Sequence, residues 1–96
     1  MIKVEKDFEL SNALDNREKD IVVIGGLAEE LYDKLSSEDP RIYGALSRTV
    51  FIPDLMINQY FGSIDLFNMF VHIVDNYNIG YNMDESKVYL SIIENK

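Results

Sequence analysis

The sequence predicts an α+β fold in which two helices pack on an antiparallel sheet of about five strands. Apolar residues recur at helical spacing in the first part of the chain and alternate with polar residues after residue 41. This order, helices first and then a meander of strands, is typical of an antiparallel sheet with helices packed on it. With 96 residues, 47% of them hydrophobic, the chain is expected to form one domain, residues 1–96, around one core.

The first part of the chain predicts two helices with a strand between them. Val4 and Phe8 are four residues apart, and a β-branched run after Asp20 is stopped by Gly25 and Gly26, which predict a break. Leucines then recur at every fourth position until Pro40. The predicted elements are a helix over residues 3–15, a strand over 20–24 and a helix over 27–36.

The rest of the chain predicts strands. In the runs that end at Pro53 and at Gly62, apolar residues recur an even number of positions apart, as on one face of a strand. Phe67 and its apolar neighbours alternate with Asn68 and His72 in the same way. The predicted strands cover residues 42–52, 55–61, 66–74, 79–81 and 88–92, with a hairpin loop over 82–86.

Charge limits the possible partners. The formal net charge is −8, and each half of the chain carries −4, so the negative field belongs to the whole domain. The nine basic residues are scattered. Binding to phosphates needs clustered lysine and arginine, so direct binding of DNA or RNA is not expected.

The chain contains no cysteine, which excludes disulfides and thiolate metal sites and agrees with a reducing compartment. Charged residues at the amino terminus and the lack of a long apolar run predict a cytoplasmic protein that does not enter a membrane. No cofactor or bound metal is predicted, and a monomer is favoured.

Motifs for catalysis are incomplete. His72 is the only histidine, and on a predicted strand it is interpreted as an exposed side chain rather than a general base. Gly25 and Gly26 precede a helix, as in phosphate-binding loops, but the remaining motif residues are missing. Asp84 and Glu85 lack the ligand spacing of a calcium loop. The chain is therefore not expected to be an enzyme.

The helix over residues 27–36 carries several carboxylates, which by themselves are typical of the solvent face of an amphipathic helix. A resemblance gives them another interpretation. The residues that carry it are Asn16, Lys19, Asp20, Glu29, Glu30, Leu31, Asp33, Leu35, Gly44 to Ser47, Ile79 to Tyr81, Asp84, Glu85 and Val88 to Leu90. Through these residues, over roughly seventy collinear positions, the chain resembles the staphylococcal-type family of uracil-DNA glycosylase inhibitors.

The resemblance implies a protein that mimics DNA and occupies the DNA-binding groove of a uracil-DNA glycosylase. Such enzymes hold phosphates beside a flipped base and insert an apolar side chain into the stack. The resemblance assigns a phosphate-mimicking role to Asp20, Glu29, Glu30, Asp33, Asp84 and Glu85. It assigns the apolar pocket for the inserted side chain to Ile24, Leu27 and Leu31.

One segment departs from the family. Residues 24–27 read Ile-Gly-Gly-Leu where family members carry carboxylate and hydroxyl groups that contact the enzyme. Two alternatives therefore stay open. Beside inhibition of a uracil-DNA glycosylase, the chain could be a mimic directed at another DNA-binding protein, such as a restriction or CRISPR nuclease, or a structural interaction module.

Overall fold

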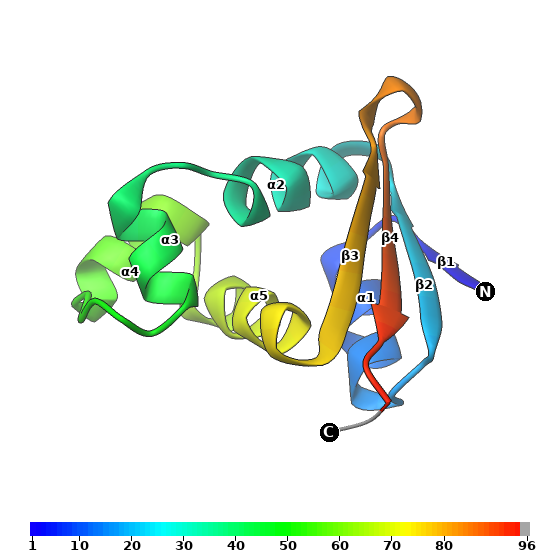
Figure 1. Cartoon of the computed structure of the whole chain (residues 1–96), viewed down its shortest axis with the longest axis horizontal. Helices are drawn as coiled ribbons and strands as arrows, with labels where there is room; N and C mark the ends of the chain where they lie inside the picture. Colours follow the sequence, from blue (N-terminus) through cyan, green and yellow to red (C-terminus); the bar gives the residue numbers. More distant parts are fainter. Residues whose placement is uncertain (95–96) are drawn as a thin grey trace.

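A sheet of four strands stands at one end of the molecule, and helices extend from it (Figure 1). The computed structural model describes residues 1–94. The elements in chain order are β1 (Ile2–Val4), α1 (Asp7–Asp15), β2 (Asp20–Ile24), α2 (Gly25–Leu35), α3 (Pro40–Leu46), α4 (Asp54–Phe61), α5 (Ile64–Asn76), β3 (Tyr77–Asn82), the short 3-10 helix η1 (Met83–Glu85) and β4 (Lys87–Ile92).

The sheet is mixed, with the strand order β1-β2-β4-β3. β1 is parallel to β2, whereas β2 and β3 are both antiparallel to β4. Ile21 lies opposite Leu90 and Val23 opposite Val88, and these four side chains are buried in the core. Because neighbours along a strand point to opposite faces, Asp20, Val22 and Ile24 lie on the other face of the sheet.

The α+β class is confirmed, but the predicted antiparallel sheet of about five strands with two helices is corrected: residues 1–94 form a mixed sheet of four strands and five α-helices. The predicted strands over residues 42–52, 55–61 and 66–74 are wrong. They correspond largely to α3, α4 and α5. The prediction was ambiguous because residues four apart have the same parity on a strand and also share a face of a helix.

In α5 the spacing of the buried residues distinguishes a helix from a strand. Phe70 and Ile73 are fully buried, and they are three residues apart, as the helical period requires. Ser63 caps the helix, since its Oγ accepts a hydrogen bond from the Leu66 N–H at 3.1 Å. The prediction that His72 lies on the exposed face of a strand is therefore wrong, because His72 lies on helix α5.

The first helix begins later than predicted, because residues 2–4 pair with β2. Its start is fixed by Glu9, whose Oε1 accepts hydrogen bonds from the backbone N–H groups of Glu5 and Lys6, each at 3.0 Å. Gly25 adopts a left-handed φ of 72°, which turns the chain directly from β2 into α2. The predicted break is therefore a single residue, and α2 starts at Gly25 rather than at residue 27.

The predicted hairpin at the carboxyl end is confirmed. β3 and β4 pair along their whole length, and η1 forms most of the predicted loop. Ser86 closes the turn with a left-handed φ of 53°. None of the helices within residues 1–94 is long and apolar enough to cross a membrane.

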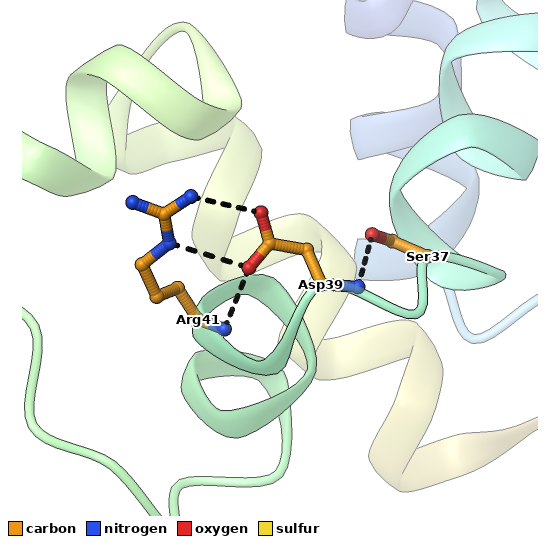
Figure 2. A network of polar contacts seen from close by, with 3 residues as sticks. All are labelled: Ser37, Asp39 and Arg41. Carbon is orange, nitrogen blue, oxygen red and sulfur yellow. Dashed lines mark hydrogen bonds and ion pairs between the residues drawn. The ribbon is translucent and has the colours of Figure 1, made fainter.

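A polar network fixes the connection between α2 and α3 (Figure 2). Asp39 caps α3 by accepting a hydrogen bond from the Arg41 N–H at 2.9 Å, and the Arg41 guanidinium donates to both oxygens of the same carboxylate at 3.3 and 3.2 Å. The Asp39 N–H donates to Ser37 Oγ at 3.1 Å. The hydrogen bonds from Arg41 hold the pKa of Asp39 below its usual value. This carboxylate is therefore engaged within the chain.

Candidate functional site

One side of α2, which carries Glu29 and Tyr32, contacts the hairpin formed by β3, η1 and β4. Tyr32 of α2 contacts Tyr81 of β3 edge to face, with ring centroids 5.1 Å apart. At the other end of this contact zone, Ser86 Oγ donates to Glu29 Oε1 at 3.3 Å, and the Gly25 N–H donates to the Ser86 carbonyl at 3.2 Å. These contacts fix the position of the hairpin relative to the first turns of α2.

Four carboxylates are exposed along this contact zone. Glu29 and Asp33 are one turn apart on α2, and Asp84 and Glu85 form the tip of the hairpin. We call these four carboxylates, together with the Tyr32–Tyr81 pair, the acidic ridge. The hydrogen bond from Ser86 to Glu29 places the end of the hairpin tip beside α2.

Two lysines lie near the acidic ridge without neutralising it. Lys34 Nζ is 3.5 Å from an oxygen of Asp33, and Lys87 Nζ is 3.9 Å from an oxygen of Glu85. Asp33 and Glu85 are largely exposed, so these ion pairs are screened by water and contribute little. Glu85 is also held by a hydrogen bond, because its Oε2 accepts from Asn82 Nδ2 at 2.8 Å.

The two tyrosines give the acidic ridge an apolar part. Tyr32 is 42% exposed and Tyr81 is 40% exposed, so part of each ring faces water while the other part packs on its neighbour. Burial raises the pKa of Tyr81, and the neighbouring Tyr32 adds to this effect. Partly exposed aromatic rings with a hydroxyl are frequent centres of protein interfaces.

Two of the predicted phosphate-mimicking residues lie apart from the acidic ridge. Asp20 starts β2 and pairs in register with Ser91, so it is about 13 Å along the strand from Ile24. Glu30 is about 100° around α2 from Glu29 and is partly buried. The structure thus brings together Glu29, Asp33, Asp84 and Glu85, but not Asp20 or Glu30.

The predicted apolar pocket is not formed as an open site. Leu31 is 0% exposed and Leu27 is 8% exposed, because both belong to the core beneath α2. Ile24 lies on the other face of the sheet by the alternation of β2. An incoming side chain could reach these leucines only by displacing core packing.

Sequence reasoning missed the Tyr32–Tyr81 pair and Glu5. Tyr32 lies between Glu29 and Asp33 in the sequence, so its place beside the acidic residues could be recognised locally. Its contact with Tyr81 of β3 depends on tertiary packing. Glu5 lies beside the start of α2, since its Oε2 is 3.7 Å from where a Cβ on Gly25 would be. A carboxylate at this position stabilises the helix amino terminus and adds negative charge near the acidic ridge.

The chemistry of the acidic ridge is that of a binding surface for cationic groups. Carboxylates accept charge-assisted hydrogen bonds from lysine and arginine, and the tyrosines supply a surface for apolar contact and cation–π contact. Within residues 1–94, no three His, Cys, Asp or Glu side chains are grouped closely enough to hold a metal ion.

Comparison of the chain with protein-family models, with curated proteins and with solved structures finds no significant match.

Proposed function

We propose that this protein is an acidic DNA mimic, and that the acidic ridge occupies the cationic DNA-binding groove of a partner protein. The observation that carries the proposal is the hydrogen bond from Ser86 to Glu29, because it brings the hairpin that carries Asp84 and Glu85 beside the acidic helix α2. The net charge of −8 favours a strongly basic partner surface and opposes nucleic acid itself.

The spacing of the carboxylates suits this role. Glu29 and Asp33 are separated by about 6 Å along the helix axis. Each phosphate of one DNA strand adds about 3.4 Å to the duplex axis, but neighbouring phosphates are farther apart in space because the backbone winds around that axis, so this pair is spaced like two adjacent phosphates. Glu29 and Glu85 each accept a hydrogen bond within the chain, which lowers the entropic cost of ordering these two side chains on binding.

The target that we propose first is a uracil-DNA glycosylase, because the resemblance covers most of the acidic ridge. The apolar contact in our proposal comes from Tyr32 and Tyr81 and not from the buried leucines of α2. A restriction or CRISPR nuclease is the second candidate, since any phosphate-binding groove offers the same arrangement of lysine and arginine.

The proposal is tested by measuring association of the protein with an immobilised uracil-DNA glycosylase over a range of salt concentrations. A ridge variant carries Glu29→Gln, Asp33→Asn, Asp84→Asn and Glu85→Gln. A control variant with the same net charge carries Glu18→Gln, Glu38→Gln, Asp54→Asn and Glu94→Gln.

We expect the ridge variant to associate about tenfold more slowly at low salt and to lose most of its salt dependence, because surface charges act mainly on the association rate. The control variant should change the rate by about twofold or less. Equal slowing by both variants would show that only net charge matters and would contradict a specific acidic ridge.

A further inference from the structure

A groove of about 510 Å³ lies between α1 and α5 and shares no residue with the acidic ridge. One helix face on each side forms its walls, because the lining residues recur at helical spacing on both helices. The lining residues are Asp7, Phe8, Ser11, Leu14 and Asp15 from α1, and Ser63, Asp65, Leu66, Asn68, Met69 and His72 from α5 and its cap.

The groove combines apolar and acidic side chains. Leu14, Leu66 and Met69 supply apolar surface, and all three are at least partly buried. Asp7, Asp15 and Asp65 are exposed. The groove can therefore take an apolar side chain and several positive charges at the same time.

The negative charge of the groove is not balanced from within the described chain. No lysine or arginine is among the lining residues. Within residues 1–94, neither Asp7 nor Asp15 nor Asp65 takes part in an ion pair. These carboxylates are also not grouped for a metal ion in that part of the chain. The charge pattern thus fits separate cationic groups better than a single ion.

The exposed ring of Phe8 is a second indication that the groove binds a ligand. Its ring is 63% exposed although it lines the groove. A large aromatic ring in water beside a partly apolar groove gains free energy when a ligand covers it. Exposed carboxylates beside exposed apolar surface match a ligand with the complementary pattern.

We propose that the groove between α1 and α5 binds a short basic segment of a partner protein, with one apolar side chain against Leu66, Met69 and Phe8 and with lysine or arginine at the three aspartates. This proposal does not depend on the acidic ridge or on a DNA-binding partner. It follows from charge complementarity, and a protein segment is favoured over a polyamine because only the segment supplies an apolar side chain.

The probe is the peptide acetyl-Lys-Arg-Leu-Arg-Lys-amide, titrated into isotope-labelled protein and followed by amide chemical shifts. A peptide with serine in place of leucine and the polyamine spermidine are the comparison ligands. The groove variant is Asp7→Asn, Asp15→Asn and Asp65→Asn, and its control, also with three carboxylates replaced, is Glu38→Gln, Asp54→Asn and Glu94→Gln. Phe8→Ser tests the apolar contact separately and leaves the core intact, because this ring is exposed.

We expect shift changes at residues of the groove, an affinity about tenfold lower in the groove variant, and a change of about twofold or less in the control. The serine peptide, spermidine and the Phe8→Ser variant should each give clearly weaker binding. Absence of binding to the unaltered protein, equal losses in the two variants, or spermidine binding as tightly as the leucine peptide would overturn the proposal.

Discussion

The hydroxyl of Tyr77 donates a hydrogen bond to the backbone carbonyl oxygen of Glu18 at 2.9 Å, across 59 residues of sequence. Tyr77 is the first residue of β3 and is 3% exposed, whereas Glu18 lies in the connection between α1 and β2. This bond joins the amino-terminal half of the fold to the hairpin that carries part of the acidic ridge.

Replacing Tyr77 by Phe should lower the free energy of unfolding by about 1–2 kcal/mol, because the ring still fills its site while the Glu18 carbonyl loses its partner. Urea unfolding of the two proteins measures the difference. An unchanged midpoint would mean that water replaces the hydroxyl at no cost.

Two tyrosines should make the fold sensitive to alkali. Burial raises the pKa of Tyr77, an effect that Arg17 opposes and Glu18 supports, and burial with Tyr32 raises the pKa of Tyr81. In the unfolded chain these phenols ionise near pH 10, whereas the folded state favours the neutral form. Their stabilising contribution is therefore complete below about pH 10 and is lost as the pH rises through the folded pKa values.

The measurement is the free energy of unfolding at about pH 9 and about pH 11, for the unaltered protein and for a variant with Tyr77→Phe and Tyr81→Phe. The variant should lose less stability between the two pH values. The same loss in both proteins would assign the alkaline sensitivity to other groups.

Gly44 is required by close packing at the end of α3. A Cβ at this position would lie 2.6 Å from Val50 Cγ2 and 2.9 Å from Val50 Cβ. Gly44→Ala should therefore cost about 1–3 kcal/mol of stability despite the better helix propensity of alanine. In a Val50→Ala background the cost should fall, and thermal unfolding of all four proteins measures this coupling. A stabilising Gly44→Ala would show that the loop after α3 moves away freely.

The tyrosine pair should act mainly on the lifetime of the proposed complex. Tyr32→Ala removes a partly exposed ring from the acidic ridge and is expected to speed dissociation from the partner by about tenfold. Tyr43→Ala is the matched control, because Tyr43 is exposed on α3 and outside the ridge. Dissociation rates that change equally in both variants would contradict a contact between Tyr32 and the partner.

The sequence could predict those parts of the fold whose residue pattern fits only one kind of secondary structure. Residues 20–24 are nearly all β-branched, and the alternating runs on either side of the turn at Asp84 are short, which favours a hairpin. Residues 54–76 admitted two interpretations, because Ile57 and Phe61 share a face on a strand and on a helix alike. The burial of Phe70 with Ile73 resolves this ambiguity, and burial is a property of the tertiary structure.

The candidate site was partly predictable for the same reason. Glu29 and Asp33 share a helix face by spacing alone, so their proximity follows from local sequence. Their approach to the hairpin depends on the packing of Tyr32 on Tyr81 and on the bond from Ser86. The pocket prediction misplaced Leu31, because a leucine at helical spacing looks the same in sequence whether it lines a pocket or fills a core.

The most direct test of the proposed function is a titration of the protein against a bacterial uracil-DNA glycosylase acting on a uracil-containing oligonucleotide. Our account predicts that excision stops at a near-equimolar ratio, that the protein shows no excision activity of its own, and that the ridge variant with Glu29, Asp33, Asp84 and Glu85 neutralised inhibits far less than the control variant. Undiminished excision at a large excess of the unaltered protein would contradict this target.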